Sequence, residues 1–122
     1  MTGQTAKRVL IVEDEVLIAM NLEDMLNDLG HEVVGQATRI DKAMELARES
    51  DIDFAVLDIN LVGKQSFPVA DILRERGIPF AFASGNGPEG LVDGYRHFPA
   101  LQKPYAQEDL ERTIARVFRE SP

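Results

Sequence analysis

The sequence predicts an α/β domain in which helices cover both faces of a parallel sheet. Short apolar runs, several of them rich in β-branched residues, alternate along the chain with segments whose apolar residues recur at helical spacing. Parallel neighbours need helical crossovers, so this alternation favours a doubly wound sheet. One run, residues 54–58, is apolar at four consecutive positions before Asp58, which is typical of a central strand buried on both faces.

Composition limits the classes of protein to which the chain could belong. Its 122 residues suffice for one domain, and 13 basic against 21 acidic residues give a net charge of -8. This balance argues against direct nucleic-acid binding and favours a protein partner or a cation-assisted anion site. The lack of cysteine excludes a disulfide framework and a thiolate metal site. No apolar run is long enough for a membrane span or a signal peptide, so we expect a soluble cytoplasmic protein.

The first strand is predicted at residues 9–12, directly before three consecutive acidic residues. A helix then runs from Val16 to just before Gly30, because apolar residues recur at helical spacing: Ile18, Leu22, Met25, Leu26 and Leu29. Residues 32–37 form a modest second strand. The second helix has one apolar face, made of Ile40, Ala43, Met44 and Ala47.

The same alternation continues through the middle of the chain. After the strand at residues 54–58 comes a loop that contains Gly63. A third helix begins near Pro68 and ends at Gly77, which are residues typical of a helix start and a helix stop. Residues 78–83 form a fourth strand that leads into a serine and a glycine.

Residues 86–96 carry the weakest pattern, since they include three glycines and a proline. We expect only a short fourth helix there, at residues 89–93. A fifth strand at residues 99–102 precedes a Lys-Pro pair, and a last amphipathic helix carries Leu110, Ile114, Val117 and Phe118. The prediction thus contains five strands and five helices, with residues 1–6 as a disordered N-terminal segment.

Polar residues that follow the strands would meet at one edge of such a sheet. Glu13 and Asp14 follow the first strand, Asp58 ends the third, Ser84 follows the fourth and Lys103 the fifth. In the flavodoxin-like strand order 2-1-3-4-5, the first and third strands are neighbours about 5 Å apart. Two carboxylates about 5 Å apart repel by roughly 3 kcal/mol, so the cluster needs counter-charge. Lys103 supplies one charge, and a divalent cation with few protein ligands, Mg²⁺ rather than Ca²⁺, would supply more.

Each of these residues also has a simpler explanation. Asp14 could cap the first helix, and Ser84 with Gly85 could form an ordinary turn. Asp58 alone could be a turn residue, and a Lys-Pro pair alone says little. The joint placement favours a site, because independent caps and turns need not converge on one edge with complementary charge.

These residues resemble the receiver domain of two-component response regulators. The resemblance consists of Glu13-Asp14 after the first strand, Asp58 ending the third, Ser84-Gly85 after the fourth and Lys103-Pro104 after the fifth. It covers residues 7–120, essentially the whole chain. The segments Asp58-Ile59-Asn60-Leu61 and Phe82-Ala83-Ser84-Gly85 are similar to receivers whose fourth-strand motif is Phe-Ala-Thr-Gly. Such receivers often occur as stand-alone proteins or in phosphorelays.

The resemblance implies a phosphoacceptor and a metal site. Asp58 would take a phosphoryl group from the phosphohistidine of a kinase and form an acyl phosphate. Glu13 and Asp14 would hold Mg²⁺ together with Asp58 and the backbone carbonyl of Asn60.

The resemblance also implies roles for a lysine and a hydroxyl, and the sequence departs from the family pattern at a few positions. Lys103 would neutralise charge on the phosphoryl oxygens, and Ser84 would donate its hydroxyl to one of them. Receivers commonly have threonine in place of Ser84, and an aromatic switch residue in place of Ala100. Asn86 replaces an aromatic of the Phe-Ala-Thr-Gly subgroup, and Tyr105 is expected to pack rather than to switch. These departures leave phosphorylation in place and alter the route of the signal.

We therefore expect a single-domain response regulator and not an enzyme that turns over an external substrate. A histidine kinase or a histidine phosphotransferase would be the donor. The output would be a contact with a downstream protein or onward phosphotransfer, without direct binding to nucleic acid or membrane. The face formed by the predicted fourth helix, fifth strand and fifth helix is expected to carry that contact.

Three alternatives stay open. A phosphohydrolase of the haloacid type would need Asp-x-Asp at the end of its first strand, whereas Asp58-x-Asn60 follows the third. A flavodoxin-like electron carrier would need a glycine-rich phosphate loop where this chain has three acids. A receiver-like binding module that no longer takes phosphate is weakened by the complete acidic cluster with Lys103.

The remaining histidines and methionines have no predicted role in the chemistry. His31 and His97 lack a plausible second metal ligand, so both are predicted at the surface or in loops. Met20, Met25 and Met44 are predicted to fill the core.

Overall fold

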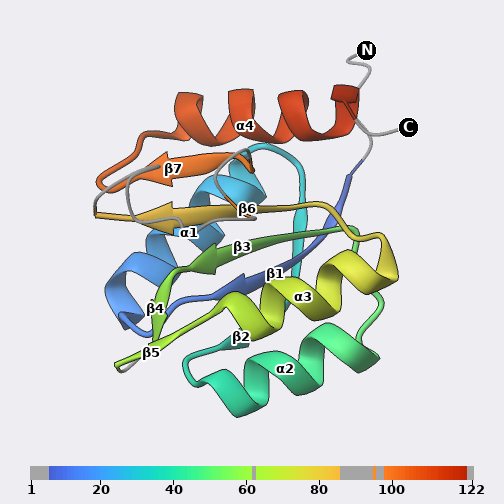
Figure 1. The fold of residues 1–122 in the computed structure, drawn as a ribbon. Helices are drawn as coiled ribbons and strands as arrows, with labels where there is room; N and C mark the ends of the chain where they lie inside the picture. The colour runs from blue at the N-terminus through green and yellow to red at the C-terminus, as the bar shows by residue number, and fades with distance from the viewer. Residues whose placement is uncertain (1–5, 62, 86–94, 96–97, 121–122) are drawn as a thin grey trace.

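The computed structural model describes residues 6–61, 63–85, 95 and 98–120, and it has the predicted doubly wound architecture (Figure 1). Its main sheet has five parallel strands in the order β2-β1-β3-β6-β7. They are β1 (Arg8–Val12), β2 (Glu32–Ala37), β3 (Phe54–Asp58), β6 (Phe80–Ser84) and β7 (Ala100–Gln102). Numbered within this sheet alone, the order is 2-1-3-4-5, so the predicted fold class is confirmed.

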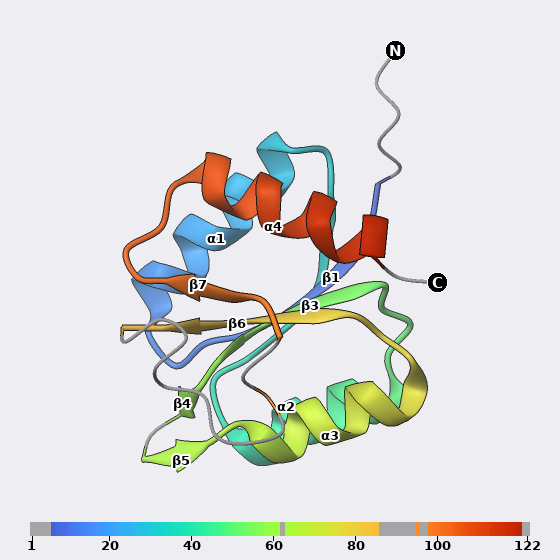
Figure 2. The ribbon, with the colours of Figure 1, turned by 45° about the horizontal axis from the view of Figure 1, so that its top comes forward.

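Four helices pack on this sheet in the described part of the chain: α1 (Val16–Asp28), α2 (Ile40–Glu49), α3 (Phe67–Arg76) and α4 (Gln107–Glu120). Helices α1 and α4 cover one face, and α2 and α3 cover the other (Figure 2). Helix α3 ends where predicted, because Gly77 takes the left-handed conformation, with φ 72°. Helix α4 is the predicted fifth helix. The short helix predicted at residues 89–93 and residues 1–5 of the predicted disordered segment lie outside the described residues.

A small antiparallel hairpin follows Asp58, where the sequence indicated only a loop. It pairs β4 (Asn60–Leu61) with β5 (Lys64–Gln65). Gly63 lies at its turn with φ 81°, a conformation that favours glycine. Strands of two residues are too short to show an alternating pattern, so they could not be predicted from the sequence. The hairpin extends from the carboxyl edge of the main sheet (Figure 1).

Two hydrophobic layers hold the helices to the sheet. Leu10, Leu57 and Phe82 belong to the layer against α2 and α3, whereas Ile11 and Val56 belong to the layer against α1 and α4. Adjacent residues of each strand thus point to opposite faces, and all of β3 and β6 is buried. This double burial explains the continuous apolar runs of the central strands.

Of the predictions about single residues, one is wrong and one holds in part. Met20 is 55% exposed on α1 and does not fill the core. His31 lies in the loop between α1 and β2, as predicted, but it is only 6% exposed there, and its Nδ1 accepts a hydrogen bond of 3.0 Å from the backbone N–H of Lys7. His97 lies outside the described residues. No helix in the described ranges is long and apolar enough to cross a bilayer.

Candidate functional site

The structure brings three acidic side chains together at the carboxyl edge of the sheet. Glu13 and Asp14 follow β1, and Asp58 ends β3, the neighbouring strand. One carboxylate oxygen from each residue lies within 4.8 Å of the other two. Glu13 and Asp58 are buried, with 3% and 7% of their surface exposed. Adjacent parallel strands that end in acids therefore produce the cluster that the sequence predicts.

Lys103 reaches this cluster from the end of β7, two strands away from β3. Its Nζ lies 2.8 Å from Oε1 of Glu13 and 3.3 Å from Oδ2 of Asp58. The side chain is largely buried, so both contacts are charge-assisted hydrogen bonds in a weakly solvated site. The structure thus shows that Glu13, and not only Asp58, is a partner of this lysine, and that Glu13 is the nearer of the two.

Backbone hydrogen bonds just beyond the strand ends hold these residues in position. The N–H of Glu13 donates to Ala37 at 3.0 Å, and the N–H of Lys103 donates to Ser84 at 2.9 Å. The N–H of Ile59, next to Asp58, donates to Ala83 at 3.1 Å. The peptide bond after Lys103 is cis. Hydrogen bonds to neighbouring strands, which continue the pairing of the sheet, therefore hold the backbone of these site residues.

The electrostatics of the cluster are unbalanced. Burial raises the pKa of Asp58, the hydrogen bond and charge of Glu13 raise it further, and Lys103 only partly opposes them, so the pKa reaches about 7. Burial acts to lower the pKa of Lys103, but Glu13 and Asp58 together outweigh it and raise that pKa. The lysine is thus held as the ammonium form, while Asp58 carries a penalty as the carboxylate.

The other two predicted site residues lie beside this cluster. Ser84 ends β6 and is buried, one residue beyond Ala83, which pairs with Asp58 across the two strands. Asn60 has an exposed side chain in β4, and its backbone N–H donates to Oδ1 of Asp58 at 3.3 Å. Both are placed next to the acceptor carboxylate. The hydroxyl and carbonyl roles expected of them remain predictions.

Tyr105 is a neighbour of the site that the sequence assigned to packing. It packs on the layer between the sheet and α1 and α4, as predicted. Its hydroxyl is buried without a hydrogen-bond partner in the described part of the chain. Burial raises its pKa, and the charges of Glu13 and Asp58 raise it further. The sequence signal for this proximity is its position two residues after Lys103.

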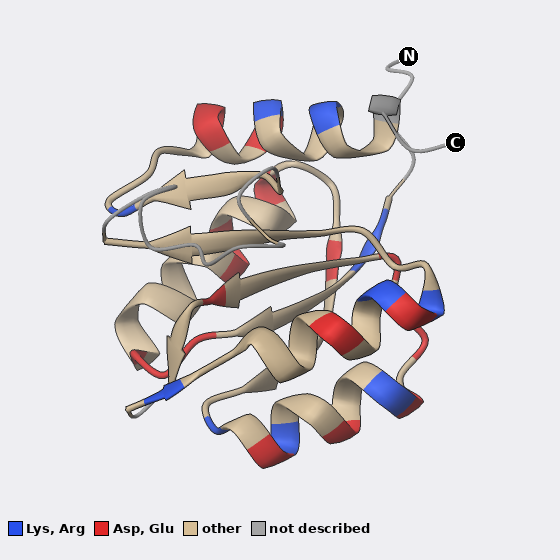
Figure 3. Ribbon diagram, viewed as in Figure 1, with Lys and Arg blue, Asp and Glu red and all other residues tan. Residues whose placement is uncertain are grey.

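The cluster has the donor set of a site for a hard divalent cation. Three carboxylates face one ammonium among the described residues, so a surplus of negative charge remains. By contrast, acidic and basic residues are mixed along the outer faces of α2 and α3 (Figure 3). Carboxylate oxygens are ligands that Mg²⁺ and Ca²⁺ take in proteins. A bound cation would relieve the repulsion that raises the pKa of Asp58.

Fold and site together define a class, the doubly wound α/β proteins with an acidic pocket and a lysine at the carboxyl edge of the sheet. The response regulator receiver domain family matches residues 9–115 of the chain. The chain therefore belongs to this family, and the resemblance drawn from its motifs is confirmed. Membership counts against the hydrolase and the electron carrier as alternatives.

Similar proteins and a similar solved structure support membership of the receiver domain family. The transcriptional regulatory protein PdtaR of Mycobacterium tuberculosis is 34% identical over 90% of this chain and 59% of its own length. The phyllosphere-induced regulator PhyR of Methylorubrum extorquens is 34% identical over 96% of this chain and 45% of its own. The solution structure of SdrG from Sphingomonas melonis superposes with a TM-score of 0.84 at 39% identity, covering 93% of this chain and 97% of that one.

The chain spans about half the length of the curated relatives that it matches, between 45% and 59% for PhyR and PdtaR. The shared part is the receiver domain. These relatives are named as regulators, which agrees with a signalling role.

Proposed function

We propose that Asp58 accepts a phosphoryl group from a histidine kinase or a histidine phosphotransferase in a Mg²⁺-dependent reaction. The phosphorylated chain then signals through a contact with a downstream protein or through onward phosphotransfer. The observation that carries this proposal is the convergence of Glu13, Asp14, Asp58 and Lys103 on one edge of the sheet.

Asp58 acts as the nucleophile. A carboxylate oxygen attacks the phosphorus of the donor's phosphohistidine, a P–O bond forms, and the P–N bond breaks with its electron pair left on the imidazole. Lys103, 3.3 Å from the carboxylate, favours the ionised form that attacks. The product is an acyl phosphate whose negative charge needs compensation at the same place.

The acidic residues fit a Mg²⁺ ion held by Glu13, Asp14 and Asp58 with the backbone carbonyl of Asn60. When bound, the ion supplies positive charge against the charge on the phosphoryl oxygens. Lys103 adds its own charge through its contact with Asp58. These residues orient the carboxylate and stabilise the transferred group.

Ser84 supplies the response to the new group. Its position at the end of β6, next to the strand that carries Asp58, lets its hydroxyl donate to a phosphoryl oxygen. That hydrogen bond exists only in the phosphorylated state. It is the local event from which a change of surface grows.

A protein contact is the favoured output. The related protein PhyR from Bartonella quintana, 33% identical over 96% of this chain and 49% of its own, is named an anti-anti-sigma factor. The net charge of -8 also disfavours direct binding to nucleic acid. The face proposed from the sequence includes the predicted fourth helix, which lies outside the described residues.

Phosphorylation with acetyl phosphate and with a phosphorylated histidine kinase tests the proposal. Intact mass should show one added phosphoryl group in the presence of Mg²⁺ and none in EDTA or in Asp58→Asn. Asp53→Asn is the matched control, since Asp53 precedes the same strand at the opposite edge of the sheet. A chain that stays unmodified by both donors in Mg²⁺ would overturn the proposal and favour the non-phosphorylated binding module.

A further inference from the structure

Five aromatic rings form a continuous cluster on the face of the sheet that α2 and α3 cover. Phe67 comes from α3, Phe80 and Phe82 come from β6, and Tyr95 and Phe98 follow β6 in the chain. Neighbouring ring centroids lie 4.9 to 5.8 Å apart. Tyr95 is only 8% exposed and contacts Phe67, Phe82 and Phe98. The pairs are tilted, edge-on and, for Phe80 with Phe98, stacked, and such contacts favour particular ring positions relative to one another.

Strand β6 joins this cluster to the site. The ring centroid of Phe82 lies 5.7 Å from that of Tyr95, and the backbone N–H of Phe82 donates to Pro99 at 3.0 Å. Two residues further on, Ser84 ends the same strand beside Asp58, and its carbonyl accepts the N–H of Lys103 at 2.9 Å. A movement of Ser84 toward a phosphoryl group therefore acts on the strand that holds Tyr95.

Arg74 joins the cluster to the surface. Its guanidinium lies 5.3 Å from the ring centroids of both Tyr95 and Phe98, within cation–π distance, and its side chain is exposed. Ala100, which lies opposite Phe82 on β7, contributes no ring. Tyr95 therefore links Phe82, the β6 ring nearest Ser84, to a charged residue on the outside of α3.

We propose that Tyr95 reports a filled site at Asp58. When Ser84 is drawn toward the phosphoryl group, the end of β6 shifts, Tyr95 repacks against Phe82 and Phe67, and Arg74 moves with it. The surface around Arg74 on α3 then differs between the two states. This inference rests on the proposed function, because the change begins with the phosphoryl group at Asp58.

Fluorine NMR of the full chain labelled with 3-fluorotyrosine tests the inference directly. The chain has two tyrosines, so the spectrum contains one signal from Tyr95 and one from Tyr105, assigned with Tyr95→Phe and Tyr105→Phe. Tyr105 lies close enough to Glu13 and Asp58 for their charges to act on it, so its signal reports occupancy of the site. Mg²⁺ with beryllium fluoride, a mimic of the phosphoryl group, is the probe. Both signals should move by more than their linewidths, and neither should move in Asp58→Asn.

Two exposed arginines of α3 provide a matched pair of variants. Arg74→Gln should shift the Tyr95 signal of the free protein and reduce its response to the mimic at least twofold, while the Tyr105 response is kept. Arg76→Gln, on the same helix but bonded to backbone oxygens instead of rings, should change neither signal.

The possible outcomes separate this inference from the proposed function. A Tyr105 signal that moves while the Tyr95 signal stays fixed would overturn the inference and leave phosphorylation at Asp58 standing. If neither signal moves in the wild-type chain, the site does not take the mimic and both proposals fail. A Tyr95 signal that also moves in Asp58→Asn would overturn the inference, since the response would not begin at the site.

Discussion

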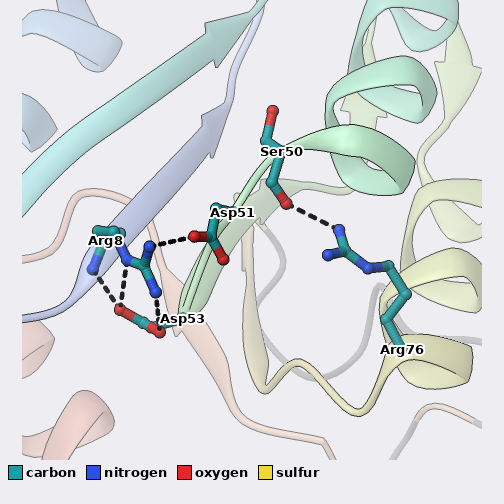
Figure 4. A network of polar contacts seen from close by, with 5 residues as sticks. All are labelled: Arg8, Ser50, Asp51, Asp53 and Arg76. Atoms are coloured by element: carbon teal, nitrogen blue, oxygen red, sulfur yellow. Dashed lines mark hydrogen bonds and ion pairs between the residues drawn. The ribbon is translucent and has the colours of Figure 1, made fainter.

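The two edges of the sheet carry charged clusters that differ in balance and in burial. At the carboxyl edge, three acids face the one ammonium of Lys103 among the described residues, and the paired side chains are largely buried. At the amino edge, Arg8 bonds to Asp51 and Asp53 with its side chain partly exposed, and Arg76 bonds to backbone oxygens nearby (Figure 4). The acids of the first cluster outnumber its one described cation, whereas both arginines of the second cluster have hydrogen-bond acceptors.

Two aspartates, Asp53 just before β3 and Asp58 at its end, show what this difference means. The hydrogen bond from Arg8 holds the pKa of Asp53 below its usual range. Burial and Glu13 raise the pKa of Asp58 to about 7. The charged form of Asp53 therefore stabilises the folded chain, and the charged form of Asp58 destabilises it. The charged aspartate at the amino edge thus stabilises the fold, whereas the charged aspartate at the carboxyl edge reduces its stability.

Removal of the counter-charge at the carboxyl edge should have the largest effect. Lys103→Gln leaves Glu13 and Asp58 facing each other without an ammonium, so the metal-free protein should lose about 2–3 kcal/mol of its free energy of unfolding. Mg²⁺ should restore more stability to this variant than to the wild type. Urea unfolding in EDTA and in Mg²⁺ measures both effects. Lys64→Gln, at an exposed lysine of β5, is the control, and equal losses in the two variants would contradict the prediction.

Exchange of each aspartate for asparagine tests the comparison itself. At about pH 8 without metal, Asp58→Asn should stabilise the chain by about 1–2 kcal/mol, because it removes a penalised buried charge. Asp53→Asn should destabilise it by less than about 1 kcal/mol, since that pair is partly exposed. Thermal unfolding at equal ionic strength compares the two variants. Changes of the same sign would remove the distinction between the two edges.

The pH dependence of the Asp58 effect has a definite sign. The folded chain holds the proton of Asp58 more tightly than the unfolded chain does, because its folded pKa is raised to about 7. The penalty is therefore complete above pH 7 and fades as the pH falls toward the unfolded value of about 3.9. The advantage of Asp58→Asn should shrink accordingly between about pH 8 and about pH 5. An advantage that grows on acidification would contradict this assignment.

His31, at the amino edge, should give an opposite pH dependence of smaller size. Burial and the charge of Lys7 lower its pKa, and its Nδ1 accepts a hydrogen bond from the Lys7 backbone, so the folded chain needs the neutral imidazole. Stability should be complete above the unfolded pKa of about 6.5 and fall by about 1 kcal/mol below it. Urea midpoints in the Asp58→Asn background, with and without His31→Gln, isolate this effect. Identical slopes between about pH 7.5 and about pH 5.5 would exclude it.

The sequence predicted the carboxyl edge well for a simple physical reason. Strands buried on both faces appear as continuous apolar runs, and the polar residues that follow them can lie only at the strand ends. The order of strands then brings Glu13, Asp58 and Lys103 together without any further information. The sequence could not predict that Lys103 lies closer to Glu13 than to Asp58, because that depends on side-chain distances.

The features that the sequence did not predict depend on contacts between distant segments. His31 is buried because it lies between the beginnings of β1 and β2 and meets the backbone of Lys7, 24 positions away. Tyr95 and Arg74 meet through a cation–π contact from different segments. Neither pairing leaves a periodic pattern in the sequence, so only the fold can show it.

The smallest effect is expected from the cap that Arg76 forms at the amino edge. Its guanidinium donates to the carbonyl oxygens of Ala47 and Ser50 at 2.7 and 2.9 Å, and these lie at the end of α2. Arg76→Gln should therefore cost about 0.5–1 kcal/mol of unfolding free energy, without any dependence on Mg²⁺. Arg48→Gln is the matched control, since it removes an equal charge from the last turn of α2 and leaves that cap intact. Equal urea midpoints for the two variants would show that charge near the helix end, and not the pair of hydrogen bonds, supports this edge of the sheet.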